Sequence, residues 1–180
     1  QHSHDHLTGL ANRQTFETNL QQAFKTQHHS SKPLFLCYID LDDIKPLNDS
    51  LGHLIGDQII KSVSDRLQAL LQTGDFLGRF AGDEFALLMV NRNKRSEVIT
   101  TAEEILKLFT QPFQIDEHKI HLSASIGIVA DDCSIQRSSE LLYHAVLAMK
   151  EAKRQGRNTW HWYEEANKKV MPVIDYAHLR

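Results

Sequence analysis

Acidic side chains follow two apolar segments of the chain, and carboxylates placed in this way could bind a divalent cation. Asp40 ends the apolar run 34–39. Asp83 and Glu84 stand at the bend of a second apolar stretch, 76–90. Mg²⁺ prefers oxygen ligands and keeps room for substrate phosphates. Such a site suits phosphoryl or nucleotidyl transfer, because the metal stabilises the attacking and leaving oxygens.

This chemistry requires the two segments to lie side by side in one sheet, and the residues alone leave simpler interpretations open. Asp83 and Glu84 are equally compatible with an ordinary hairpin whose tip is acidic. Adjacent side chains on extended backbone also point to opposite faces, so these two need not share one role. Three acids crowd the end of the first run, Asp40, Asp42 and Asp43, and a cation would relieve their repulsion. Helix N-capping by Asp42 or Asp43 is the alternative there.

Two basic residues near the end of the last predicted helix, 138–155, could contact phosphate groups. Lys153 and Arg157 are four residues apart, so we expect them on the same side of that helix. An ammonium and a guanidinium placed together could grip phosphates. The alternative, of equal weight, is favourable placement of both cations at the negative end of the helix dipole.

Apolar periodicity predicts the elements that would hold these residues. Helical spacing predicts four helices, at 12–26, 55–71, 95–110 and 138–155. Strands are predicted at 34–39, on both sides of the bend at 81–84, and at 160–163. A second hairpin is predicted over 111–130, with its turn near 116–118 and its second strand at 123–129, and residues 48–53 are predicted as a turn. Hairpin-paired strands interspersed with helices argue for an α+β domain, with a central, mainly antiparallel sheet surrounded by helices.

Length and composition fit one ordinary globular domain. The chain has 180 residues and a formal net charge of −3, so no basic surplus supports nucleic-acid binding. No run reaches the roughly 18 apolar residues of a membrane helix, so we expect no direct membrane contact by this domain. Cys37 lies in an apolar run and is expected to be a buried thiol, which favours a reducing cytoplasm. No initiator Met opens the chain, so we expect a fragment of a longer protein that could be anchored in the inner membrane.

Six segments, in order, resemble the motifs of the GGDEF domain of diguanylate cyclases. The resemblance covers about residues 5–163, so we expect a GGDEF domain over 1–163. Residues 164–180 are then a linker tail, weakly similar to the connector that leads into an EAL phosphodiesterase domain. The matching segments are DHLTGLANR at 5–13, DLD and ND with Lys45 at 40–49, GHLIGD at 52–57, AGDEF at 81–85, SIG at 125–127 and AKRQGRN at 152–158.

The resemblance implies a diguanylate cyclase, which condenses two GTP molecules into cyclic di-GMP and releases two pyrophosphates. It also implies a fold similar to class III nucleotidyl cyclases and polymerase palms. Each domain of the family binds one GTP, so we expect catalysis to need a homodimer. A sensor domain and an EAL domain fused to the same chain are the other expected partners. The alternative is a GTP-binding regulatory domain with little turnover, which controls a fused EAL phosphodiesterase.

The resemblance assigns the metal ligands and the catalytic pair by position. Asp40 and Asp83 would bind Mg²⁺ or Mn²⁺, with the carbonyl of Leu41 assisting. Glu84 would bind metal or help to activate the ribose 3′-hydroxyl. Asp83 and Glu84 are therefore the expected catalytic residues.

The resemblance assigns the substrate contacts in the same way. Asn48 and Asp57 would read guanine, because an amide and a carboxylate suit the donor edge of that base. Lys45, Lys153 and Arg157 would hold phosphates. The remaining expected substrate-binding positions are Ile44, which replaces the usual Phe of the pocket wall, Asp49 and His53.

Two departures from the family pattern bear on activity. Ala81 stands where the signature has its first glycine. It lacks glycine's freedom at positive φ but adds only a methyl group, so we expect reduced rather than abolished activity. Many cyclases also carry an RxxD product-inhibition site before the signature. Here Asp75 remains but Gln72 replaces the Arg, so we expect weak or absent inhibition by cyclic di-GMP at that site.

Overall fold

The computed structural model describes residues 2–28, 30–132 and 134–164, so the predicted linker tail lies outside them apart from Glu164. Asn12 caps the first helix by accepting a hydrogen bond from the N–H of Thr15 at 2.9 Å. The helices are α1 (Arg13–Gln27), α2 (Ile44–Leu51), α3 (His53–Ala69), α4 (Arg95–Leu108) and α5 (Ser138–Arg154). The strands are β1 (Phe35–Leu41), β2 (Phe76–Ala81), β3 (Glu84–Met89), β4 (Phe113–Ile115), β5 (His118–Ile120), β6 (Ala124–Ala130) and β7 (Thr159–Trp162).

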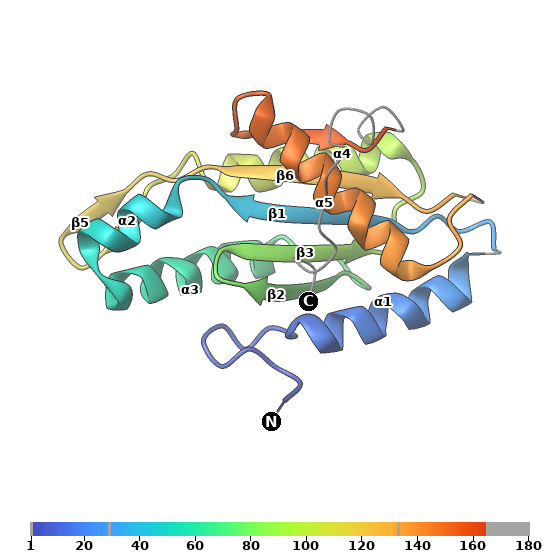
Figure 1. Cartoon of the computed structure of the whole chain (residues 1–180), viewed down its shortest axis with the longest axis horizontal. Helices are drawn as coiled ribbons and strands as arrows, with labels where there is room; N and C mark the ends of the chain where they lie inside the picture. The colour runs from blue at the N-terminus through green and yellow to red at the C-terminus, as the bar shows by residue number, and fades with distance from the viewer. Residues whose placement is uncertain (1, 29, 133, 165–180) are drawn as a thin grey trace.

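Five strands form the main sheet, in the order β2-β3-β1-β6-β7 (Figure 1). Strand β1 lies at the centre because its continuous apolar run can be buried on both faces. It pairs antiparallel with β3 and with β6, and β2 pairs antiparallel with β3. Strand β7 runs parallel to β6 at one edge. The predicted α+β fold with a mainly antiparallel sheet is therefore confirmed.

Helices cover both faces of this sheet. Helices α3 and α4 pack on the face that carries Cys37 and Ile39 of β1, while α1 and α5 pack on the face that carries Leu36 and Tyr38. This division follows from the alternation of side chains along the strand. In Figure 1, α1 and α5 lie in front of the sheet and α3 lies behind it. With both faces covered, polar side chains reach solvent at the strand ends, where β1 carries Asp40.

Gly127 allows the close approach of α5 to β6. An ideal Cβ at this glycine would lie 2.1 Å from the carbonyl oxygen of Ala145 and 2.2 Å from the backbone nitrogen of Met149. A side chain at this position would push α5 away from the sheet, and Lys153 in its last turn would move with it. Glycine is therefore needed at position 127 of this strand.

The turn predicted over 48–53 is wrong. Helix α2 continues as far as Leu51, and Gly52, at a φ of 89°, is the break between α2 and α3. The polar residues in this segment resembled a loop because they are suited to solvent. In the folded chain they are largely the outer residues of a short helix.

The second hairpin turns where predicted, at 116–117. The strand predicted at 123–129 is observed as β6, but the prediction that it pairs within this hairpin is wrong. Strand β4 pairs with the three-residue β5 in a separate small sheet, whereas β6 joins the main sheet between β1 and β7. The apolar run of β6 is buried along almost its whole length. Such a strand belongs in the interior of a sheet with both faces covered, rather than in a hairpin with one face in water.

Candidate functional site

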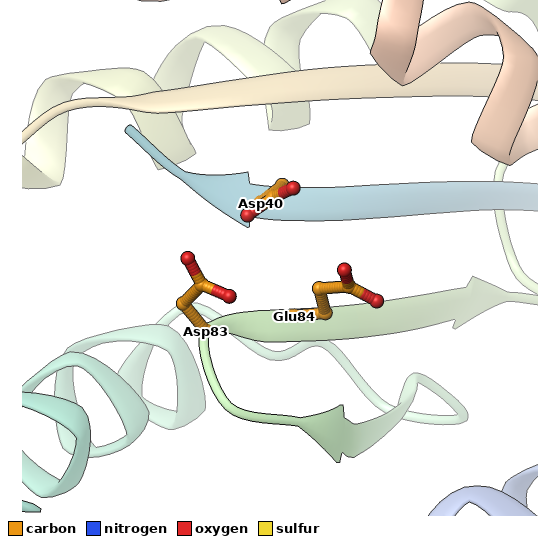
Figure 2. Close-up of side chains that lie close together, drawn as sticks. All are labelled: Asp40, Asp83 and Glu84. Carbon is orange, nitrogen blue, oxygen red and sulfur yellow. The ribbon is translucent and has the colours of Figure 1, made fainter. Parts of the chain in front are cut away.

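The end of β1 and the bend before β3 lie side by side at one end of the main sheet. Asp40 is the register partner of Glu84, and the N–H of Leu41 donates to the carbonyl oxygen of Asp83 at 3.1 Å. Carboxylate oxygens from Asp40, Asp83 and Glu84, one from each, lie within 4.8 Å of one another. Figure 2 shows these three side chains gathered at the strand ends. The two acidic segments meet, as the metal-site hypothesis requires.

Asp83 and Glu84 approach Asp40 together although they are adjacent in the sequence. Alternation along a strand would send them to opposite faces, but β3 begins only at Glu84 and Asp83 belongs to the bend. Gly82 takes a left-handed conformation in that bend, at a φ of 50°. Figure 2 shows the carboxylate of Asp83 directed toward Asp40, with Glu84 further along β3. The bend therefore lets neighbouring residues contribute to one cluster.

The alanine of the signature has no left-handed backbone. Ala81 is exposed at the end of β2 and is not one of the described non-glycine residues with positive φ. Gly82 does need positive φ, and the signature keeps its glycine there. Backbone strain therefore gives no reason for reduced activity, and that expectation rests on the added methyl group alone.

Asp40 resists ionisation beside the other two carboxylates. Burial and the neighbouring Asp83 raise the pKa of Asp40 from 3.8 to about 8, and Lys153 offsets part of this shift. A divalent cation held between the carboxylates would supply the opposite charge that they lack. Oxygen donors held at strand ends are the donors that Mg²⁺ and Mn²⁺ prefer, so the residues present fit such an ion.

Asp42 does not join this cluster, so the predicted crowding of three acids at the end of β1 is wrong. Its carboxylate accepts hydrogen bonds from Ser123 Oγ at 2.6 Å, from Ser125 Oγ at 2.7 Å and from the N–H of Asn158 at 3.0 Å. Burial opposes ionisation, but these hydrogen bonds outweigh it and lower the pKa of Asp42. Asp42 therefore braces β1 against β6 and β7 rather than binding metal.

Helix capping does not explain these acids either. Asp43 occupies the N-cap position of α2, at a φ of 55°, but its side chain makes no capping hydrogen bond. Its carboxylate is 75% exposed. Asp42 is already engaged by its serine partners, so the predicted capping by either side chain is not observed.

The predicted pairing of Lys153 and Arg157 on one helical face is wrong. Helix α5 ends at Arg154, and Gly156, at a φ of 123°, follows in a conformation that stops helices. Arg157 lies beyond the helix, at a φ of 67°, with its Nε 3.9 Å from Asp43 Oδ1. Its side chain is half exposed, so it remains available to a ligand.

Lys153 instead reaches the end of β1 from the last turn of α5. Its Nζ donates to the carbonyl oxygen of Leu41 and to Asp42 Oδ1, both at 3.2 Å, and lies 3.6 Å from Asp40 Oδ2. The lysine therefore neutralises part of the negative charge beside the cluster. It also occupies one lone pair of the Leu41 carbonyl, which leaves that oxygen one more.

A cleft of about 310 Å³ adjoins the carboxylate cluster, between α2, the start of α3 and the bend before β3. Its volume is at the lower end of the range typical of small-molecule sites. Asp83 belongs to both the cluster and the cleft, so a ligand in the cleft would lie next to a bound metal. The lining residues are Ile44, Lys45, Asn48, His53, Gly56, Asp57, Ile60, Arg79, Gly82 and Asp83.

The cleft contains a buried acceptor that a ligand could satisfy. Asn48 Oδ1 has no hydrogen-bond partner among the residues that the structure describes. Gly56 makes room for it, since a Cβ there would lie 2.2 Å from that oxygen. An unpaired buried acceptor lowers stability, so a donor on a bound ligand would be favourable. Asp57 lines the same cleft and offers a second acceptor.

The structure thus brings together most of the predicted site residues but not all. The carboxylate cluster holds the three acidic ligands, and five predicted substrate residues line the cleft: Ile44, Lys45, Asn48, His53 and Asp57. Asp49, Lys153 and Arg157 are not among the lining residues. Asp49 is exposed on α2.

Sequence reasoning assigned no role to Arg79, which supports the bend. Its Nε and Nη2 donate to the carbonyl oxygen of Gly82 at 3.0 and 2.9 Å, and its Nη1 donates to Asp5 Oδ1 at 2.9 Å. Asp5 in turn accepts hydrogen bonds from the N–H and Oγ1 of Thr8. Its position two residues before the signature indicated that Arg79 lies near the site. The sequence does not show that Gly82 and Asp5 are its partners, because only the fold brings Asp5 next to it.

Tyr38 is the second residue that sequence reasoning missed. Its side chain lies on the same face of β1 as Asp40, and its hydroxyl donates a hydrogen bond to Glu84 Oε1. Burial and the charge of Glu84 raise the pKa of Tyr38, so the phenol stays protonated as a donor. Only the β1–β3 register brings these two residues together.

Comparison with known proteins identifies the family. The family model described as "Diguanylate cyclase, GGDEF domain" matches residues 2–159. The chain belongs to this GGDEF family. The resemblance drawn from its six motifs is confirmed.

Relatives with curated names include cyclases and bifunctional proteins. The chain is 37% identical over 163 residues to MucR of Pseudomonas aeruginosa, named a bifunctional diguanylate cyclase/cyclic di-GMP phosphodiesterase. It is 32% identical over 156 residues to DgcP of Escherichia coli, named a diguanylate cyclase. These matches cover 91% and 86% of the chain, but the chain spans only 24% of MucR and 46% of DgcP.

Solved GGDEF domains have the same fold. The GGDEF domain of TpbB from Pseudomonas aeruginosa matches with a TM-score of 0.88 and 30% identity, covering 94% of this chain and 99% of that one. The GGDEF domain of DgcB from Caulobacter crescentus, solved in complex with c-di-GMP, matches with a TM-score of 0.85 and 27% identity, covering 92% and 95%. No helix in the described part of the chain is long and apolar enough to cross a bilayer.

Proposed function

We propose that this GGDEF domain is a diguanylate cyclase that condenses two GTP molecules into cyclic di-GMP with Mg²⁺ or Mn²⁺. The observation that carries the proposal is the cluster of Asp40, Asp83 and Glu84 beside a cleft of about 310 Å³. Relatives named diguanylate cyclases over the matched region support the same reaction. The retained acids and the absence of left-handed strain at Ala81 support an active signature.

The carboxylate cluster would hold the metal. Asp40 and Asp83 would be ligands, with the second lone pair of the Leu41 carbonyl and one oxygen of Glu84 available beside them. A bound Mg²⁺ would polarise the α-phosphate of GTP and stabilise the departing pyrophosphate. Lys153 would offset part of the negative charge at the strand end while the site is empty, and could move to a phosphate oxygen when the metal arrives.

The cleft would hold the guanine. Asn48 Oδ1 and the carboxylate of Asp57 would accept hydrogen bonds from the N–H groups of the base, which satisfies the buried oxygen of Asn48. Ile44 would supply an apolar wall, since it is buried and lines the cleft. Lys45 also lines the cleft and would reach phosphate oxygens. Arg157, which lies beside Asp43 of the loop between β1 and α2, would contact the same phosphates.

Two domains would have to face each other. In each half-reaction the 3′-oxygen of one GTP bonds to the α-phosphorus of the other, the 3′-hydroxyl loses its proton, and pyrophosphate leaves. Glu84 would help to remove that proton, because its carboxylate lies in the cluster and can act as a general base. Two such steps close the ring, so a homodimer with one GTP in each domain supplies both nucleophiles.

The experiment is a turnover assay with matched variants. We expect the purified chain to convert GTP and Mg²⁺ into cyclic di-GMP, with a rate that rises more steeply than linearly with protein concentration. Asp83→Asn should abolish this turnover, whereas Asp116→Asn, an exposed acid in the β4–β5 turn, should not change it. Equal rates for the wild type and Asp83→Asn would rule out the proposed site.

A regulatory role is the second candidate. It is favoured by NbdA of Pseudomonas aeruginosa, a relative 34% identical over 160 residues that is named a cyclic di-GMP phosphodiesterase. In that case GTP would bind in the cleft and control a fused EAL domain with little turnover. Tight GTP binding without product would support this candidate over the cyclase.

A further inference from the structure

Tyr38 is joined to the carboxylate cluster by one hydrogen bond that the proposed reaction does not use. Its hydroxyl donates to Oε1 of Glu84, while Asp40 lies two residues further along the same strand. Asp40 is also the register partner of Glu84. Tyr38 therefore contacts the cluster through Glu84.

Packing fixes the position of this hydroxyl. The Tyr38 side chain is 3% exposed, and its ring meets Phe80 edge-on, with the centroids 5.5 Å apart at 87°. Phe80 is held in turn by Phe16, at 5.3 Å, and by the guanidinium of Arg13, at 5.5 Å from the ring centroid. A phenol held in this way can direct Glu84 in a way that a mobile surface donor could not.

The hydrogen bond makes the two oxygens of Glu84 unequal. The hydrogen bond takes one lone pair of Oε1 and holds that oxygen toward the buried phenol, so binding a metal through both oxygens would require Oε1 to turn away from Tyr38, whereas Oε2 lacks that constraint. A carboxylate that offers one oxygen suits Mg²⁺, which demands six ligands in near-octahedral geometry. A carboxylate that offers both oxygens suits Ca²⁺, which takes six to eight ligands and often binds carboxylates through both.

We propose that Tyr38 is a positioning residue that restricts Glu84 to one metal-binding oxygen and so makes the site prefer Mg²⁺ over Ca²⁺. The inference rests on the proposed function, since it assumes that the carboxylate cluster holds a metal–nucleotide complex. Its physical basis is the hydrogen bond between Tyr38 and Glu84 and the packing that holds the phenol. The competing explanation is that Glu84 merely satisfies a buried hydroxyl, which predicts no change in ion preference.

The test compares the affinity of one nucleotide in two metal complexes. The probe is 3′-deoxy-GTP, which lacks the attacking hydroxyl and cannot react, titrated calorimetrically in saturating Mg²⁺ and then in saturating Ca²⁺. We expect the wild type to bind the Mg²⁺ complex more tightly. In Tyr38→Phe this preference should fall about tenfold, as is typical when a residue that orients a metal ligand is lost.

Two further variants separate the outcomes. Tyr143→Phe removes a hydroxyl from α5 and should keep the full preference for Mg²⁺. Glu84→Gln offers the metal a single amide oxygen, so it should keep the preference for Mg²⁺, and adding Tyr38→Phe to it should have no further effect, because Tyr38 acts through the second carboxylate oxygen. The double variant shows whether the effect of Tyr38→Phe passes through Glu84 or comes from a change in folding.

The results distinguish this inference from the proposed function. If the wild type binds neither complex, both fail. If it binds with a preference for Mg²⁺ that Tyr38→Phe leaves unchanged, or that Tyr38→Phe lowers equally in the Glu84→Gln background, only the inference is overturned and the hydroxyl has a structural role. A loss of preference in Tyr38→Phe that is absent in the Glu84→Gln background, with the control unaffected, supports it.

Discussion

Arg79 holds the carbonyl oxygen of Gly82 with two N–H groups, Nε at 3.0 Å and Nη2 at 2.9 Å. Gly82 is the left-handed residue of the bend that directs Asp83 toward Asp40. The guanidinium therefore fixes the geometry of the carboxylate cluster without being one of its ligands. Its third contact, to Asp5, joins the bend to the N-terminal loop.

Arg79→Lys should lower turnover while leaving the fold intact. A lysine offers a single charged nitrogen and cannot reproduce the planar fork that grips the Gly82 carbonyl and Asp5 together. We expect turnover with Mg²⁺ and GTP to fall roughly 10- to 100-fold, the usual effect of losing a residue that orients ligands. Initial rates measure this, with circular dichroism to check the fold. Arg137→Lys, at the exposed N-terminus of α5, is the matched control and should behave as wild type.

Asp40 should make the metal-free protein less stable as pH rises. Its pKa is raised from 3.8 to about 8, so between these values the folded state binds more protons than the unfolded state. The free energy of unfolding should therefore fall as pH rises through this window. Urea unfolding in EDTA at several pH values measures the slope, and Mg²⁺ should restore stability at the upper end, where Asp40 ionises to bind it.

Asp40→Asn is the control for this pH dependence. The amide does not titrate, so the variant should lose most of the decline in stability and most of the stabilisation by Mg²⁺. A decline as steep as that of the wild type would assign the effect to other groups. In that case the burial of Asp40 would not determine the charge of the cluster.

The meeting of Asp40 with Asp83 could be predicted because both follow apolar runs, and strands of one small sheet end at shared edges. The contact between Tyr38 and Glu84 could not, because these residues are 46 positions apart and only the register of β1 against β3 brings them together. The gathering of the adjacent Asp83 and Glu84 in one cluster was expected from the family resemblance, but strand alternation alone would have placed them on opposite faces, and that rule fails at a bend with a left-handed glycine.

Local sequence pattern predicted the wrong course of the chain in two places. The polar residues before Gly52 looked like a turn, yet they complete α2 and place Asn48 in the cleft. Arg157 looked like the next position on α5, but the helix ends three residues earlier. In both cases a glycine with positive φ, Gly52 or Gly156, marks where the helix stops, and the polarity of the residues before it is a weak guide to that boundary.

Ala81→Gly tests whether the unusual signature limits the enzyme. Because Ala81 does not use positive φ, glycine would relieve no strain and would add freedom to the unfolded chain. We expect the free energy of unfolding to fall by about 0.5–1 kcal/mol and turnover to stay at the wild-type level. Thermal unfolding and initial rates measure the two effects. A clear rise in turnover would show instead that the methyl group hinders the substrate.

Cyclic di-GMP should not inhibit this domain through the segment before the signature. Asp75 there is 1% exposed and accepts hydrogen bonds from Arg92 Nη1 at 2.7 Å and from Nη2 at 3.0 Å. Its Oδ2 also accepts the N–H of Gln72 at 3.0 Å. Both oxygens are therefore engaged within the fold, and the arginine of the inhibitory motif is missing. Initial rates with increasing cyclic di-GMP should decline only at concentrations that compete for the GTP cleft.

Substitutions in and around this segment distinguish a structural role of Asp75 from a role in binding cyclic di-GMP. Gln72→Arg alone should not create inhibition, because Arg92 still holds Asp75. Arg92→Met should instead lower the free energy of unfolding by roughly 3–5 kcal/mol, since it leaves the buried charge of Asp75 unpaired. Urea unfolding measures that loss, and Arg92→Met combined with Asp75→Leu should recover part of it. Potent inhibition of Gln72→Arg by cyclic di-GMP would mean that Asp75 can leave Arg92 for the ligand, and would contradict its structural role.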